Sequence, residues 1–177
     1  MTELRMIRQW AMPNKNTFSI KPIRELILRV MQTGFWLDPF ANSNKFTSTE
    51  TKAKIITNDL NPEFNTNYHL DALEFLQRYK DSTCDGVLFD PPFSKRQLSE
   101  CYKSVGRAVS QEDTQESYWS NIKKEISRIT KQGGKVVTFG WNSGGVGKRN
   151  GFELTEVLLV PHGGGHYDTI VTVEVKR

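Results

Sequence analysis

Apolar residues recur along this chain with two different periods, and each period predicts a different kind of element. Three segments place apolar side chains at the 3.6-residue spacing of a helix with one buried face. These predicted helices cover residues 21–32, 72–79 and 118–131. Short apolar or alternating runs predict strands instead. The predicted strands cover residues 35–37, 54–59, 68–70, 86–90, 135–141, 152–160 and 168–175.

The ends of the predicted helices are marked by residues with a known conformational preference. We expect Ser19 to cap the first helix and Gly34 to end it. Asp71 is a suitable N-cap for the second helix. The glycine pair at 133–134 is expected to stop the third helix before the next strand begins.

The order of these elements predicts the fold class. A first helix is followed by alternating strands and helices, which predicts a mainly parallel sheet with helices on its faces. The last two strands are joined by residues 161–166 and form a predicted antiparallel hairpin. We therefore predict an α/β fold with a Rossmann-like sheet of about seven strands, mainly parallel with a C-terminal antiparallel hairpin. The 177 residues suffice for one well-buried core, so a single domain over 1–177 is expected.

Composition and charge narrow the functional classes. Hydrophobic residues make up 37% and charged residues 25%, which is typical of a globular protein rather than a disordered one. No apolar run is long enough to span a membrane, and the N-terminal segment lacks the apolar core of a secretory signal. Cys84 and Cys101 cannot form a disulfide framework, so a cytoplasmic protein is expected. The net charge of +4 suits a polyanionic partner.

The strongest candidate for chemistry is the segment V-L-F-D-P-P-F-S at residues 87–94. Its apolar run predicts a buried strand, and Pro91 and Pro92 end that strand because neither can donate a ladder hydrogen bond. Asp90 and Phe93 are thus placed on a stiff turn at the carboxyl end of a strand, where ligands bind in open α/β sheets. The structural alternatives are a turn aspartate at 90 and a core aromatic at 93.

Asp59 is a second candidate, at the end of the second predicted strand. It lies 21 residues after Asp38 (59 − 38), which ends the first strand. An acidic residue at about this spacing binds ribose hydroxyls in Rossmann sites. A solvated loop aspartate is the alternative.

Two segments carry a resemblance to a known family. D-P-P-F at residues 90–93 resembles the catalytic motif of amino-group methyltransferases that use S-adenosylmethionine. D-P-F-A-N-S-N at residues 38–44 resembles the D-P-F-x-G-S-G segment of DNA amino-methyltransferases, whose turn passes close to the methionine part of the cofactor. This chain has Asn42 and Asn44 where that family usually has glycine. Asparagine tolerates left-handed conformations better than most residues, so the turn can survive with less room.

The resemblance implies a class I methyltransferase fold and a set of cofactor contacts. Asp59 would bind the ribose, Leu60 would lie against the adenine ring, and Asp71 would accept from the adenine amine unless it only caps its helix. The segment N-T-F-S-I-K-P at residues 16–22 resembles the motif that closes over the cofactor, although Phe18 could simply belong to the core. The predicted cofactor-binding residues are Phe18, Lys21, Asp38, Phe40, Asn42, Asp59, Leu60, Asp71 and Ala72.

The resemblance also implies a mechanism for the D-P-P-F turn. In the resembling enzymes, an aspartate and a proline carbonyl accept the two hydrogens of an exocyclic base amine and turn its lone pair towards the methyl group. The corresponding groups here are Asp90 and the carbonyl of Pro91, and Phe93 would stack on the base. A target within a duplex would first have to be flipped out. The predicted catalytic residues are Asp90, Pro91, Pro92 and Phe93.

The substrate prediction rests on motif order and spacing. Only 50 residues separate Phe40 from Asp90, which leaves no room there for a target-recognition domain. We predict an adenine methyltransferase acting on DNA with short or relaxed specificity, similar to small enzymes of phages and other bacterial mobile elements. That places it in the cytoplasm of a bacterial host cell and leaves room for a partner protein that supplies specificity. The predicted nucleic-acid contacts are Lys95, Arg96, Lys103, Arg107, Lys148 and Arg149.

Two other functions remain open at this point. Small ribosomal guanine-N2 methyltransferases also carry D-P-P-F, so an RNA base methyltransferase is one alternative. A catalytically inactive, methyltransferase-like binding protein is the other, because of Asn42 and Asn44. No metal site is expected, since His162, His166 and Asp168 lie on a glycine-rich turn where solvated histidines are the simpler prediction.

Overall fold

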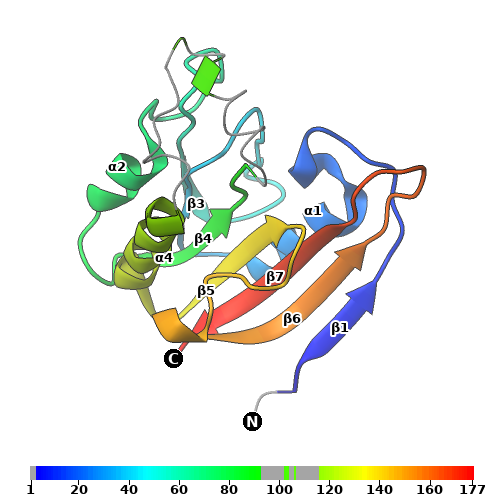
Figure 1. Ribbon diagram of the computed structural model, residues 1–177. Helices are drawn as coiled ribbons and strands as arrows, with labels where there is room; N and C mark the ends of the chain where they lie inside the picture. The colour runs from blue at the N-terminus through cyan, green and yellow to red at the C-terminus, as the bar shows by residue number, and fades with distance from the viewer. Residues whose placement is uncertain (1–2, 93–101, 104–105, 107–115) are drawn as a thin grey trace.

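A seven-stranded sheet in the order β1-β6-β7-β5-β4-β2-β3 organises the protein (Figure 1). The computed structural model describes residues 3–92, 102–103, 106 and 116–177. Its strands are β1 (Arg5–Arg8), β2 (Phe35–Asp38), β3 (Lys54–Thr57), β4 (Cys84–Phe89), β5 (Thr130–Gly140), β6 (Phe152–Val160) and β7 (Thr169–Lys176). Its helices are α1 (Lys21–Val30), α2 (Ala72–Gln77) and α4 (Glu116–Ile129), with short 3-10 helices η1 (Thr17–Ser19) and η3 (Lys148–Asn150).

Strand direction confirms the predicted fold class. The pairs β1–β6, β2–β3, β2–β4 and β4–β5 are parallel, whereas β7 runs antiparallel to both β5 and β6. The carboxyl ends of β2, β3, β4 and β5 therefore meet at one edge of the sheet, which we call the carboxyl edge. The candidate residues that follow β2, β3 and β4 are brought to this edge.

Each face of the sheet has its own hydrophobic core. Successive residues of a strand point to opposite faces. Leu88 of β4 and Val137 of β5 pack under α1, whereas their neighbours Val87 and Val136 pack under α2 and α4. Figure 1 shows α1 on one side of the sheet and the other two helices on the opposite side. None of the helices in the described part of the chain is long and apolar enough to cross a membrane.

The structure corrects several predicted boundaries. Strand β1 was not predicted, because Arg5 and Arg8 hide its pattern, and it pairs in parallel with β6. The predicted strand at 68–70 is reduced to one bridge between Asn58 and Tyr68. Ser19 lies in η1 and does not cap α1, which begins after Ile20 without a side-chain cap.

The glycine pair at 133–134 does not stop the third helix. Helix α4 ends at Ile129, and β5 begins at Thr130 and runs through both glycines. The Thr130 hydroxyl donates to the Ile126 carbonyl at 2.6 Å, and Thr130 pairs with Cys84 of β4. The β4–β5 register shifts between the pairs Cys84–Thr130 and Gly86–Lys135, so both glycines lie in an irregular stretch of β5, where Gly133 has φ of +75°.

Candidate active site

Three aspartates gather at the carboxyl edge. Asp38 ends β2, Asp59 lies two residues beyond β3, and Asp90 follows β4 directly. The Asp38 side chain is only 2% exposed, and burial raises its pKa well above the usual value for aspartate. The negative charges of Asp90 and Asp59 raise the pKa of Asp38 further, while a hydrogen bond from the Phe40 N–H opposes the shift. The cluster is therefore a site of negative potential that a bound cation would stabilise.

The turn after β2 contains a residue in the left-handed region. Asn42 has φ of +51°, and its side-chain oxygen accepts the Ser43 N–H at 2.7 Å. Among the described non-glycine residues only Asn42 and Ser82 have positive φ, so Asn44 does not need glycine-like freedom. The prediction that asparagine preserves this turn is confirmed at Asn42.

Asp59 connects the two strand ends through backbone hydrogen bonds. Its Oδ2 accepts the Asn42 N–H at 2.8 Å, and its Oδ1 accepts the Asn61 N–H at 2.9 Å. Burial raises the pKa of Asp59, and these two hydrogen bonds oppose the increase. A carboxylate oxygen can accept more than one hydrogen bond, so the predicted ribose contact remains a prediction that this geometry permits. Leu60 is half-buried next to Asp59.

Asn58 organises this region and was not among the predicted site residues. Its side chain is fully buried and donates to the carbonyls of Pro39 (3.1 Å) and Leu70 (3.0 Å). Its own oxygen accepts the Leu70 N–H at 2.9 Å. Asn58 thereby joins β2, β3 and the segment before α2. Its place next to Asp59 was the only sequence signal, because its partners are set by the tertiary structure.

Asp71 caps α2, as predicted, and also binds two tyrosines. Its Oδ1 accepts the Leu73 N–H at 2.9 Å. Its Oδ2 accepts the hydroxyls of Tyr102 (3.0 Å) and Tyr118 (2.9 Å). Burial and the Asp71 charge raise the pKa of Tyr118, so this phenol stays protonated and donates. The predicted contact of Asp71 with adenine remains a prediction, as does that of the buried Ala72.

The segment at residues 16–22 reaches the D-P-P turn through Thr17. The Phe18 ring is fully buried, with its centroid 4.7 Å from Phe139, so it belongs to the core. The Thr17 hydroxyl makes a hydrogen bond with the Asp90 carboxylate. Lys21 is exposed at the start of α1. Thr17 was not a predicted site residue, whereas the cofactor contacts of Phe18 and Lys21 remain predictions.

The environment of Asp90 shifts the pKa of its carboxyl group. It is half-buried, and removal from water raises its pKa to about 7, although the hydrogen bond with Thr17 lowers it. A carboxyl group with this pKa exchanges a proton near neutral pH, which is the property of a general base. Phe93, the last residue of the motif, lies outside the described residues.

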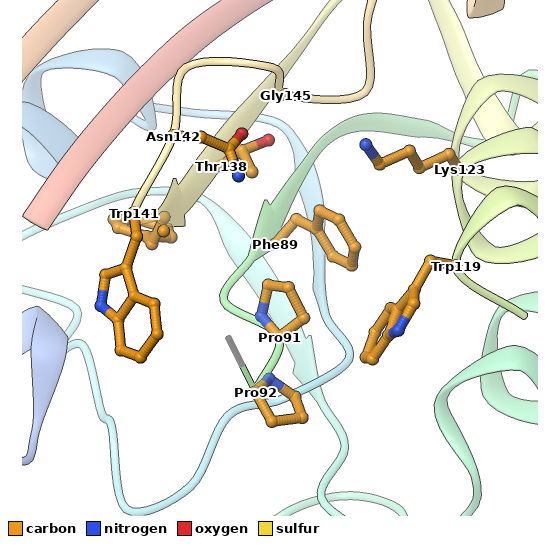
Figure 2. Close-up of a pocket in the computed structure, with 11 residues that line it drawn as sticks. Phe89, Pro91, Pro92, Trp119, Lys123, Thr138, Trp141, Asn142 and Gly145 are labelled. Carbon is orange, nitrogen blue, oxygen red and sulfur yellow. The ribbon is translucent and has the colours of Figure 1, made fainter. Parts of the chain in front are cut away.

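A pocket of about 250 Å³ opens at the Pro91–Pro92 turn that follows Asp90. Its walls combine aromatic and proline rings with a few polar groups. They comprise Phe89, Pro91, Pro92, Trp119, Lys123, Thr138, Phe139, Gly140, Trp141, Asn142 and Gly145. In Figure 2 the indoles of Trp119 and Trp141 lie on either side of the Pro91–Pro92 turn, and the Lys123 amine points into the pocket. Flat apolar walls with a few polar groups suit a planar heterocycle.

The pocket wall after β5 is held by a buried carboxylate. Glu174 of β7 is 2% exposed and accepts the backbone N–H groups of Val146 (2.7 Å) and Gly147 (2.9 Å). Burial raises the pKa of Glu174, and the two hydrogen bonds oppose the shift. The loop that carries Asn142 and Gly145 is thus tied to the sheet.

Comparisons with known proteins were made by sequence and by structure. No family model matches the sequence, and a search of curated proteins found no match. The structure is similar to that of TrmN from Thermus thermophilus, with a TM-score of 0.56 and 19% identity over 89% of this chain and 49% of TrmN. It is also similar to 1,6-didemethyltoxoflavin-N1-methyltransferase from Burkholderia thailandensis, with a TM-score of 0.57 and 12% identity over 86% of this chain and 75% of that enzyme.

A third similar structure matches along its whole length. The protein yhhF from Escherichia coli, described as a candidate methyltransferase, aligns over 98% of both chains with a TM-score of 0.56 and 13% identity. This chain has a class I methyltransferase fold. It spans about half the length of TrmN, and identities this low establish the fold alone. The Burkholderia enzyme was crystallised with 1,6-didemethyltoxoflavin and S-adenosylhomocysteine.

The predicted nucleic-acid contacts do not all lie near the D-P-P turn. Lys148 and Arg149 lie in η3, where the Asn150 carbonyl accepts the Ser127 hydroxyl of the last turn of α4 at 2.7 Å. The last turn of α4 lies at the amino ends of the strands, opposite the carboxyl edge where Asp90 lies. The fold therefore does not bring Lys148 and Arg149 to the D-P-P turn. Lys103 is exposed. The remaining predicted contacts lie outside the described residues, namely Lys95, Arg96 and Arg107.

One histidine of the hairpin turn is buried rather than solvated. The His162 side chain is within hydrogen-bond distance of the Ala11 carbonyl (2.8 Å) and the Thr169 hydroxyl (2.8 Å). The solvated prediction is wrong for His162, because the chain after β1 packs against the hairpin and covers it. His166 is exposed, as predicted.

Proposed function

We propose that this chain is an S-adenosylmethionine-dependent methyltransferase that acts on the exocyclic amine of adenine in DNA, with short or relaxed specificity. The observation that carries the proposal is the position of Asp90. On one side it interacts with the carboxylate cluster through Asp38, and on the other it adjoins the aromatic pocket through Phe89 and Pro91. A two-part site of this kind suits group transfer between a cationic donor and a flat acceptor.

The carboxylate cluster fits the proposed cofactor. S-adenosylmethionine would supply a methyl group on a positively charged sulfonium. Asp38, Asp59 and Asp90 all have a raised pKa, so a cation in their midst would offset an existing electrostatic cost. Asn42 would bring the turn backbone close to the cofactor, with Phe40, Leu60 and Asp71 at neighbouring positions. The Burkholderia enzyme, which has the same fold and binds S-adenosylhomocysteine, supports this assignment.

The pocket fits the proposed acceptor. An adenine ring between Trp119 and Trp141 would lie against Pro91 and Pro92, and we propose that its amine reaches Asp90 and the Pro91 carbonyl at the start of this turn. These two oxygens would accept the amine hydrogens and leave the nitrogen lone pair facing the methyl group. Transfer of the methyl group would break its bond to the sulfonium sulfur, leaving S-adenosylhomocysteine, and would form a bond to the amine nitrogen. The nitrogen would then lose one proton, which Asp90 could accept because its pKa is about 7.

The preference for DNA rests on the sequence motifs. The Lys21–Pro22 pair, which forms the start of α1, and the D-P-F turn at residues 38–40 resemble DNA amino-methyltransferases. The net charge of +4 suits a polyanion. We further propose that residues 1–177 form a single methyltransferase domain and that a partner protein supplies additional specificity.

The direct test is methyl transfer from labelled S-adenosylmethionine to separate pools of DNA and RNA, followed by nucleoside analysis. We expect label in N6-methyladenine from DNA, and loss of that label in Asp90→Ala with cofactor binding retained. Label in a guanine of RNA would replace the adenine assignment with the RNA alternative. Calorimetry with S-adenosylmethionine provides the control, because absence of binding would contradict both enzyme assignments.

A further inference from the structure

Two stacked aromatic rings border the acceptor pocket on its outer side. The ring centroids of Trp141 and Tyr167 are 4.5 Å apart and their planes are tilted by 30°. Trp141 also lines the pocket next to the Pro91–Pro92 turn (Figure 2). Tyr167 is 72% exposed and Trp141 is 38% exposed. The pair therefore continues the aromatic wall of the pocket out to the molecular surface.

The two rings are carried by the paired ends of rigid strands. Trp141 follows Gly140, which pairs with Ile170 of β7, and Tyr167 lies shortly before the start of that strand. The bonds of His162 to Ala11 and Thr169 hold the hairpin turn in place. A surface that is already ordered loses little conformational entropy when a ligand binds.

We propose that Trp141 and Tyr167 form a stacking platform for the bases of a single-stranded nucleic acid whose neighbouring base enters the pocket. This inference rests on the proposed function, because it takes the pocket as the acceptor site. Aromatic side chains stack on any base, and a nearby cation attracts the backbone phosphates. Such contacts are tolerant of sequence, which agrees with a short or relaxed specificity. Because Trp141 lines the pocket, a strand with one base in the pocket would have its neighbouring base close to this ring.

The test compares binding of two strands that differ only in their bases. Fluorescence anisotropy would measure the affinity of a labelled 12-nucleotide DNA, the matching RNA, and an abasic strand with the same phosphates. Tyr167→Ala should weaken binding of the base-containing strand by roughly tenfold, the size expected for one stacked base. It should leave binding of the abasic strand unchanged, and Tyr167→Phe should behave like the wild type.

Met6→Ala is the matched control, because Met6 is 73% exposed on β1 and lacks an aromatic ring. Equal losses in Met6→Ala and Tyr167→Ala, or equal losses for both strands in Tyr167→Ala, would overturn the stacking platform. So would a wild-type dimer that Tyr167→Ala dissociates, since a second copy would then cover this surface. A wild type that binds S-adenosylmethionine but no nucleic acid would instead contradict the proposed function itself. A stronger effect on RNA than on DNA would assign the platform to RNA.

Discussion

The Asp59 carboxylate accepts the backbone N–H of Asn42 at 2.8 Å and so joins the end of β3 to the turn after β2. Asn42 is in the left-handed region, with φ of +51°, and this bond is one of those that hold it there. The two residues come from the two motifs that were expected to bind different parts of one cofactor. Their contact means that a change in either one affects the geometry of both.

The left-handed turn predicts a difference between two substitutions of Asn42. Asn42→Gly should change the free energy of unfolding by less than about 1 kcal/mol, because glycine adopts this φ without strain. Asn42→Val should cost roughly 1–2 kcal/mol more, because a β-branched residue is strongly disfavoured there. Urea unfolding measures both values, and calorimetry with S-adenosylhomocysteine should show weaker binding only for Asn42→Val. Equal destabilisation by both variants would argue against the left-handed assignment.

The pKa of Asp90 predicts a pH dependence of methyl transfer. A neutral carboxyl group accepts hydrogen bonds poorly and cannot take a proton, so activity should require ionised Asp90. With a pKa of about 7, the ionised fraction is about one tenth at pH 6 and about nine tenths at pH 8. We expect kcat/KM to rise several-fold over this interval, since it reports the groups of the free enzyme. A flat profile between pH 6 and 8 would be inconsistent with Asp90 as the base.

The same shift predicts a pH-dependent effect on stability. In the unfolded chain Asp90 ionises near pH 4, whereas in the folded protein it holds its proton up to about pH 7. Ionisation of Asp90 therefore lowers the free energy of unfolding progressively as the pH rises from about 4 to about 7. This loss of stability is complete above pH 7. Asp90→Asn removes the titration, so its melting temperature relative to wild type should rise from pH 4 to pH 8. A difference that does not change with pH would show that the pKa of Asp90 is not raised.

The hydrogen bonds that Glu174 accepts from the loop after β5 predict that two glycines with positive φ differ in their tolerance of alanine. Gly145 has φ of +52°, and a Cβ there would overlap the Glu174 carboxylate. Gly133 has φ of +75°, and its Cβ position meets nothing within 4 Å. Gly133→Ala should lower the free energy of unfolding by about 1 kcal/mol through backbone strain alone. Gly145→Ala should lower it by roughly 1–3 kcal/mol more, because the new Cβ also overlaps Glu174. Gly145→Ala should also raise KM for the acceptor, because Gly145 lines the pocket.

A pair of residues on neighbouring strands predicts a rescue by double substitution. Trp36 of β2 pairs with Gly86 of β4, and a Cβ on Gly86 would overlap the six-membered ring of the Trp36 indole. Gly86→Ala should therefore destabilise the fold by about 2 kcal/mol or more. With Trp36→Leu already present, the added cost of Gly86→Ala should be much smaller, so the two substitutions should not be additive. Additive costs in urea unfolding would mean that the indole does not lie over Gly86.

Sequence patterns were most reliable where one residue type has only one workable conformation. The prolines after Asp90 ended β4 as expected, and the Asp71 cap began α2 as expected. The patterns failed where pairing between distant strands decides the outcome. Strand β1 exists because β6 offers it a partner, and the glycines at 133–134 lie within β5 because that strand pairs with β4 before and after them, at Thr130 and Lys135.

The candidate site also contains some residues that local sequence patterns identify and others that only the tertiary structure brings together. The aspartates at 38, 59 and 90 could be identified from their positions after apolar runs, because parallel strands bring their carboxyl ends together. The walls of the pocket could not, since Trp119, Lys123 and Trp141 follow no local motif. Their common location depends on where α4 and the end of β5 lie relative to β4.

The sequence by itself determined the α/β class, the strand ends that carry the aspartates, and the tolerance of Asn42 for a left-handed turn. These are local properties, set by hydrophobic period, proline chemistry and backbone sterics. Only the tertiary structure decided that Asp90 has a pKa of about 7 and that Trp141 and Tyr167 form one surface. Burial, electrostatic interaction and ring stacking depend on distances between residues far apart in the chain, and those distances exist only after the sheet has formed.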